Sequence, residues 1–164
     1  MAEWIRGVDT SKWQGNVAWK EVAVYGIRFA IVKSSEGTGY RDPRFKDNWK
    51  GIGDTDMYRG AYHFARISRS PTILQDARDE ADWFLETIGE LGERDLPPTL
   101  DVEWDRRAKG IKPPEIVRWC LEFLNRVEDA TGRTPMVYTG RNFWRWKLAR
   151  TAELSRFPLW QVQY

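Results

Sequence analysis

Short apolar runs alternate with helical patterns along the whole chain of 164 residues, and this alternation restricts the fold more than any other feature. Strands separated by helices pair in parallel and carry the helices on the outside of the sheet. The sequence therefore predicts an α/β fold, either a barrel or an open doubly wound sheet. Apolar runs predict strands over residues 4–9, 27–35, 58–64, 97–104, 135–140 and 158–164, and apolar spacings of three and four predict helices over 17–24, 43–50, 70–88 and 113–131.

Length and charge narrow the class of protein further. No linker or repeat interrupts a chain of this length, so we expect a single domain over residues 1–164. The net charge of +2 is too small for a nucleic-acid partner, because such proteins concentrate Lys and Arg on one face. We interpret the basic and aromatic segment 141–150 as amphipathic, with its aromatic rings turned inward. No run approaches the roughly 18 apolar residues of a membrane span.

The sequence offers few residues for metal or nucleophilic chemistry. One cysteine, Cys120, and one histidine, His63, leave too few of the usual ligands for a zinc site. Neither a G-x-S-x-G elbow nor a glycine-rich phosphate loop is present. A magnesium site made only of carboxylates stays open, because Mg²⁺ takes oxygen ligands. We expect no metal and no cofactor.

Ten tryptophans set the composition apart. Tryptophan and tyrosine fill cores, but they also line grooves that stack on flat ligands such as sugar rings. We expect well over half of the tryptophans in the core. The tryptophans and tyrosines outside the core favour a sugar rather than a phosphate as the ligand.

Polar side chains fall near the C-terminal ends of the predicted strands. In a βα barrel, active sites are built from side chains at that rim. We therefore expect one site that gathers them, composed of Asp9, Lys33, Glu36, His63, Asp101, Glu103 and Tyr138.

Asp101 and Glu103 lie one residue apart in a predicted strand, on the same face, with Cα atoms roughly 6.6 Å apart. Carboxyl groups without ligand histidines fit glycoside hydrolysis, in which one is the acid and another the base, nucleophile or stabiliser. Crowded carboxyls also raise one another's proton affinity. The alternatives are a structural acceptor for Asp101, a surface ion pair for Glu103 and a turn residue for Asp9. We interpret His63 as a hydrogen-bonded wall residue rather than a proton shuttle.

Six segments occur in the order seen in glycoside hydrolase family 25, the lysozymes of the N-acetylmuramidase type, and the chain resembles that family over essentially its whole length. The combination of D-x-S-x-x-Q-G with D-x-E is specific. The segments are GVDTSKWQG (7–15), FAIVKSSEGTGYRDPRF (29–45), RGAYHFAR (59–66), PTLDVEW (98–104), PMVYTG (135–140) and PLWQVQY (158–164).

The resemblance implies an irregular (β/α) barrel of the TIM-like type that cleaves the β-1,4 bond between N-acetylmuramic acid and N-acetylglucosamine in peptidoglycan. It implies that Glu103 is the proton donor and that Asp101 assists by steering the substrate's N-acetyl group as internal nucleophile. Asp9 would line the same pocket. The residues that we expect to bind the substrate are Tyr62, Tyr138, Lys33, Glu36, His63 and Trp104.

Family members usually continue for some tens of residues past the last predicted strand, and that tail carries a late aspartate of the site. The sequence ends at Tyr164, so we expect a barrel that is incomplete at its C-terminus. A non-catalytic module that binds carbohydrate or cell wall on a degenerate barrel is therefore the alternative function. No separate wall-binding domain is visible. The oligomeric state, the stereochemical outcome and the target bacteria are not predicted.

The N-terminal segment lacks the apolar stretch of a secretory signal peptide. We therefore expect synthesis in the cytoplasm and action on the bacterial cell wall, reached as a phage-type endolysin through a partner pore or by another export route. No membrane partner is expected.

Overall fold

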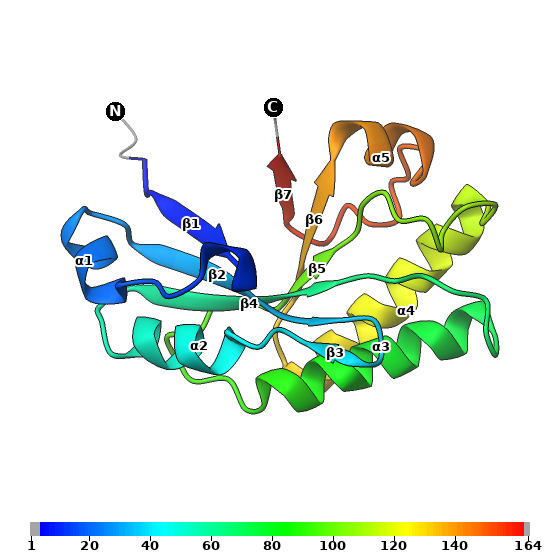
Figure 1. The fold of residues 1–164 in the computed structure, drawn as a ribbon. Coiled ribbons are helices and arrows are strands. Elements are labelled where there is room, and N and C mark those ends of the chain that lie inside the picture. The colour runs from blue at the N-terminus through cyan, green and yellow to red at the C-terminus, as the bar shows by residue number, and fades with distance from the viewer. Residues whose placement is uncertain (1–3, 163–164) are drawn as a thin grey trace.

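The computed structural model describes residues 4–162 and contains one curled sheet with helices packed against it (Figure 1). Six strands run parallel in the order β1-β2-β4-β5-β6-β7, and β3 pairs antiparallel with β2. The predicted α/β class, with an incomplete TIM-like barrel, is confirmed. The strands are β1 (Gly7–Thr10), β2 (Phe29–Glu36), β3 (Tyr40–Arg41), β4 (Tyr58–Phe64), β5 (Thr99–Asp101), β6 (Met136–Gly140) and β7 (Leu159–Val162).

The three longer helices lie together on one side of the sheet, and α3 and α4 pack side by side there (Figure 1). Parallel strands need a crossover between them, and these helices supply it. The helical elements are η1 (Lys12–Gln14), α1 (Trp19–Val24), α2 (Phe45–Gly53), α3 (Ile73–Ile88), α4 (Pro113–Thr131) and α5 (Arg141–Trp146).

Local signals in the sequence fix the ends of α3 and α4. The Thr72 side chain accepts a hydrogen bond from the Gln75 N–H and so caps α3. Pro113 occupies the first turn of α4, where its missing N–H costs nothing. Gly132 ends α4 in the left-handed conformation at φ 66°, which a glycine adopts without steric cost. The predicted bounds of α4 are therefore confirmed.

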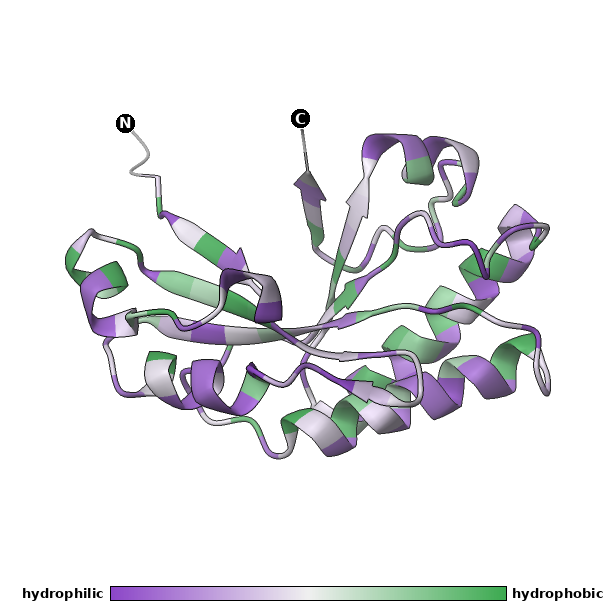
Figure 2. Ribbon diagram, in the orientation of Figure 1, coloured by the Kyte–Doolittle hydropathy of each residue, from purple (hydrophilic) through white to green (hydrophobic). Residues whose placement is uncertain are grey.

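A layer of aromatic rings joins α3 and α4 to the sheet. The rings of Phe84 and Phe123 stack with centroids 6.0 Å apart, and Trp119 stacks on Phe123 at 5.4 Å. All three side chains are fully buried. Figure 2 shows hydrophobic and hydrophilic bands alternating along both helices, as expected for helices with one face on a core.

Several sequence predictions were wrong in detail. β5 stops at Asp101 instead of continuing to residue 104, so Glu103 lies in the loop that follows the strand. β1 begins at Gly7 rather than residue 4. The two-residue strand β3 was missed, because it is too short to produce a periodic pattern. The last two residues of the predicted strand 158–164 lie outside the described residues.

The prediction for the tryptophans was also wrong. Only Trp19 and Trp119 of the ten are buried, while Trp13 and Trp146 are among those more than half exposed. Trp49 and Trp144 are partly buried and pack against the core, so fewer than half of the indole rings belong to it or touch it. None of the helices within residues 4–162 is long and apolar enough to cross a membrane.

Candidate active site

A pocket of about 140 Å³ opens at the C-terminal ends of the parallel strands. In a parallel ladder, residues in register point to the same face, and Asp101 is in register with Tyr138, which is in register with Trp160. The Tyr138 and Trp160 rings meet edge to face with centroids 4.8 Å apart. Side chains from five strands and one loop therefore converge, and they are Asp9, Tyr62, Asp101, Glu103, Tyr138 and Trp160.

Two carboxyl groups dominate the chemistry of the pocket. Asp101 is 6% exposed, and burial raises the pKa of its carboxyl well above the ordinary value, with a further increase from the Glu103 charge. Burial also raises the pKa of Glu103, against the lowering effects of a hydrogen bond with Asp101 and of the Lys33 charge. Because the two carboxyls share a hydrogen bond and both have raised pKa values, the pair holds a proton at a pH that ionises ordinary carboxyls.

Two further polar groups of the pocket have shifted pKa values. The pKa of Asp9 is raised by burial. Burial also raises the pKa of Tyr62, and the nearby charges of Asp101 and Asp9 raise it further. Tyr62 therefore stays a phenol at physiological pH and can donate a hydrogen bond from its hydroxyl to a ligand.

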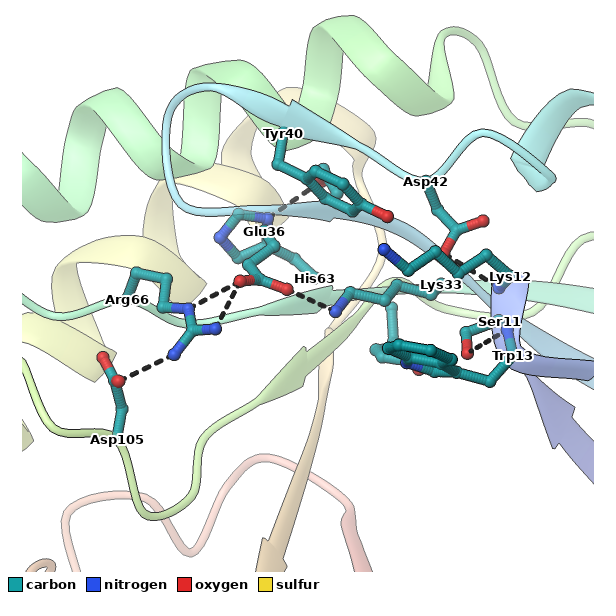
Figure 3. A network of polar contacts seen from close by, with 12 residues as sticks. Ser11, Lys12, Trp13, Lys33, Glu36, Tyr40, Asp42, His63, Arg66 and Asp105 are labelled. Atoms are coloured by element: carbon teal, nitrogen blue, oxygen red, sulfur yellow. Dashed lines mark hydrogen bonds and ion pairs between the residues drawn. The ribbon is translucent and has the colours of Figure 1, made fainter.

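Lys33 brings a positive charge to one side of the pocket. Its ammonium lies 4.9 Å from the centroid of the Phe64 ring and donates to the Glu36 carboxylate at 2.5 Å (Figure 3). Burial raises the pKa of Glu36, but hydrogen bonds from Lys33 and Arg66 outweigh burial and lower it. Glu36 is therefore ionised and anchors Lys33 beside the pocket.

The sequence matches the model of glycosyl hydrolases family 25 over residues 8–164. The chain belongs to glycosyl hydrolase family 25. Lysozyme M1 of Streptomyces globisporus is 34% identical over 145 residues, which cover 85% of this chain and 48% of that protein. The chain spans about half the length of the first curated relatives that it matches.

Solved structures of the family share the fold. A muramidase from Trichobolus zukalii superposes with a TM-score of 0.89 at 31% identity, over 98% of this chain and 78% of that chain. The modular Cpl-1 endolysin, solved as a mutant in complex with a peptidoglycan analogue, has a TM-score of 0.74 at 25% identity and covers 94% of this chain and 42% of its own.

One expectation for the family 25 site was wrong. His63 is fully buried and points to the helix side of the sheet, so it does not contact a ligand in the pocket. Its Nδ1 atom lies 2.9 Å from the Ser35 hydroxyl oxygen, and its Nε2 atom lies 2.8 Å from Glu80 Oε2. Its ring is sandwiched near Phe84 and Phe123. Adjacent residues of a strand face opposite sides, so Tyr62 enters the pocket and His63 enters the core.

Trp104 and Glu36 lie beside the pocket without lining it. Trp104 is 57% exposed and packs edge to face on Phe143. The Lys147 ammonium lies 5.5 Å from the centroid of the Trp104 ring. Their contacts with substrate, like those of Lys33, remain predictions, because none of these three side chains belongs to the pocket wall.

Sequence reasoning missed Trp160 as a pocket residue. The signal was present in the alternation of the last strand, where Trp160 takes the same face as its register partner Tyr138. The ion pair of Arg66 with Asp105 was also missed. Neither residue stands in a strand pattern, and their contact joins parts of the chain 39 residues apart.

Other features of the described residues give no competing site. Among residues 4–162, no three His, Cys, Asp or Glu side chains are arranged to hold a metal ion. A wider hollow of about 550 Å³ lies between α3 and α4. Three of its four charged residues form ion pairs along the helix surfaces, Arg126 with Asp82 and Glu122 with Arg78.

Proposed function

We propose that this family 25 chain is a glycoside hydrolase that cleaves the β-1,4 bond between N-acetylmuramic acid and N-acetylglucosamine in peptidoglycan. The observation that carries the proposal is the pair of carboxyls, Asp101 and Glu103, whose pKa values are raised by burial in a pocket that also contains Asp9. The names of the relatives, a lysozyme and a muramidase, support the same reaction, and the peptidoglycan analogue bound to Cpl-1 supports the substrate class.

Glu103 is the proton donor in this proposal. Its side chain is less buried than that of Asp101, so it is the member of the pair that a glycosidic oxygen can reach. Glu103 gives its proton to the leaving oxygen while the bond from that oxygen to the anomeric carbon breaks. The anomeric carbon gains positive charge in the transition state, which the carboxylate of Asp9 stabilises.

Asp101 assists through the substrate's own N-acetyl group. As a carboxylate, Asp101 accepts a hydrogen bond from the N–H of the N-acetyl group. This contact turns the carbonyl oxygen of the N-acetyl group toward the anomeric carbon, where a new C–O bond forms. The same hydrogen bond stabilises the ionised form of Asp101, so the proton that the two carboxyls share is favoured on Glu103. The Glu103 carboxylate then takes a proton from water as the water attacks the anomeric carbon and opens the cyclic intermediate.

The remaining pocket residues bind and orient the sugar. The edge-to-face pair of Tyr138 and Trp160 offers an aromatic wall on which an apolar sugar face can pack. Tyr62 donates a hydrogen bond from its phenolic hydroxyl to the sugar, and the charge of Lys33 favours the ionised forms of Asp101 and Glu103.

Because the proposed substrate is peptidoglycan, the place of action in this proposal is the bacterial cell wall, which the chain reaches after synthesis in the cytoplasm.

Lysis of purified bacterial walls, measured as loss of turbidity, tests the proposal. The parent should lyse the walls, and Glu103→Gln should reduce the rate by about 10²–10⁴-fold, the usual contribution of a general acid. Glu90→Gln changes an exposed glutamate and is the matched control, which should keep the parent rate. Walls that the parent binds without lysis would instead support a wall-binding module.

A chelator tests the remaining alternative, a metal-dependent phosphoesterase. The proposed muramidase reaction uses only carboxyl groups, the substrate and water. Wall lysis in excess EDTA should therefore proceed at the parent rate. Loss of lysis that added Mg²⁺ restores would contradict the proposed mechanism.

A further inference from the structure

A guanidinium group links the loop that carries Glu103 to the end of β4. Arg66, which follows β4, donates from one terminal nitrogen to Asp105 Oδ1 at 2.7 Å and from Nε to Glu36 Oε1 at 2.7 Å (Figure 3). The Asp105 side chain is 6% exposed. Its second oxygen is buried and has no hydrogen-bond partner among the described residues. The ion pair with Arg66 is therefore the contact that compensates burial of the Asp105 charge.

The same guanidinium also fixes the cation of the pocket. Glu36 receives hydrogen bonds from both Arg66 and Lys33. The charge of Lys33 in turn acts on both Asp101 and Glu103. Arg66 thus contacts two parts of the site at once, Asp105 two residues beyond Glu103 and the Glu36 carboxylate that binds Lys33.

Arg66 is itself anchored in the core. Its backbone N–H donates to both carboxylate oxygens of Glu80, at 3.2 and 3.0 Å, and Glu80 also contacts His63. The guanidinium carbon lies 4.8 Å from the centroid of the Phe64 ring. A buried polar cluster under the sheet therefore fixes the start of the side chain, and an aromatic face supports its end.

We propose that Arg66 is a positioning residue, which clamps the Glu103 loop through Asp105 and holds Lys33 beside the carboxyl pair through Glu36. The proposal rests on the proposed function and extends it to a residue outside the pocket wall. A guanidinium is suited to this task because its planar donors point in several fixed directions at once. A lysine ammonium keeps the charge but lacks the fork that reaches two carboxylates.

Asp105→Ala tests the clamp most cleanly, because it releases the loop and leaves the bonds between Arg66 and Glu36 in place. We expect kcat on peptidoglycan to fall about tenfold while KM stays within twofold, since the residues that bind sugar lie on the sheet. Arg66→Lys should lose as much, and Arg66→Gln at least as much. Arg126→Gln is the matched control, because it breaks an exposed pair with Asp82 in which an arginine also donates twice to one carboxylate.

Hydrogen exchange of the peptide that covers residues 102–112 supplies a readout independent of activity. Asp105→Ala and both Arg66 variants should speed exchange in this segment and leave the helices unchanged, whereas Arg126→Gln should leave exchange in this segment at the parent rate. Parent-like exchange in the Asp105 variant would overturn the clamp, as would parent-like kcat. A fall in kcat without faster exchange in the loop would overturn it as well. An inactive parent would contradict the proposed function, and exchange would still decide whether the clamp exists.

Discussion

At the scale of single residues, the site depends on where one proton resides among the carboxyl groups of the pocket. Burial raises the pKa values of Asp9, Asp101 and Glu103, and the charges of Glu103 and Asp9 raise that of Asp101 further. Lys33 opposes this rise, because its positive charge lowers the pKa values of Asp101 and Glu103. With both pKa values raised, the pair keeps a proton for transfer to a higher pH than ordinary carboxyls do.

Lys33→Gln should shift the alkaline limb of the pH–activity profile to higher pH. Removal of the ammonium removes a stabiliser of the carboxylates, so the pKa values of Asp101 and Glu103 rise and the proton is kept to a higher pH. The pH dependence of kcat/KM for parent and variant measures the shift. Lys50→Gln removes a lysine that is 79% exposed and should leave the profile unchanged. A shift of the Lys33 variant to lower pH would contradict the electrostatic role.

At the scale of elements, periodicity predicted the longer strands and helices well. β4 lies at its predicted residues, 58–64, and α4 begins at its prolines and ends at its glycine. The bounds of β5 could not be read in the same way, because apolar residues continue past Asp101 in a loop. Strand alternation also leaves open which face meets the helices. That is why His63 was predicted at the pocket, although the structure shows it in the core.

The contact of α3 with α4 contains an acidic residue whose titration should affect stability. Asp76, in the first turn of α3, has a pKa raised to about 6, chiefly by burial. Its Oδ2 atom accepts the backbone N–H of Ser68 and the indole N–H of Trp119, each at 2.8 Å. The folded chain therefore binds a proton that the unfolded chain releases near pH 4, so the stability contributed by this group is full below about pH 4 and is lost as the pH rises through about 6.

Asp76→Asn should remove this pH dependence. The amide oxygen of the variant can accept both hydrogen bonds without carrying a charge. The free energy of unfolding of the variant minus that of the parent should therefore be larger at pH 8 than at pH 4, by up to about 3 kcal/mol. Asp76→Ala leaves the indole N–H of Trp119 unpaired and should cost about 1–3 kcal/mol at pH 4. Urea unfolding at several pH values measures both. An equal pH dependence in parent and Asn variant would contradict this account of Asp76.

At the scale of the whole molecule, one sheet and one core connect all the elements of residues 4–162. The sheet runs without a break from β1 to β7, and a single cluster of buried side chains includes Ile52 of α2, Phe84 of α3, Phe123 of α4 and Phe143 of α5. The pocket depends on this continuity, because its walls come from strands at both ends of the sheet.

We therefore expect the chain to unfold as one cooperative unit. Calorimetry should give one transition with a calorimetric enthalpy close to the van't Hoff enthalpy. Loss of pocket-dependent binding and loss of helical signal should occur at the same temperature. Two resolved transitions would contradict a single domain and would separate the two halves of the pocket.

The sugar at the new reducing end of digested peptidoglycan tests the central claim most directly. After digestion by the parent, the reducing ends are converted to sugar alcohols and identified by mass spectrometry. The roles of Glu103 and Asp101 predict muramitol derivatives from the parent and none above background from Glu103→Gln. Glucosaminitol derivatives would mean that the other glycosidic bond is cleaved. That result, or no new reducing ends at all, would contradict the muramidase assignment.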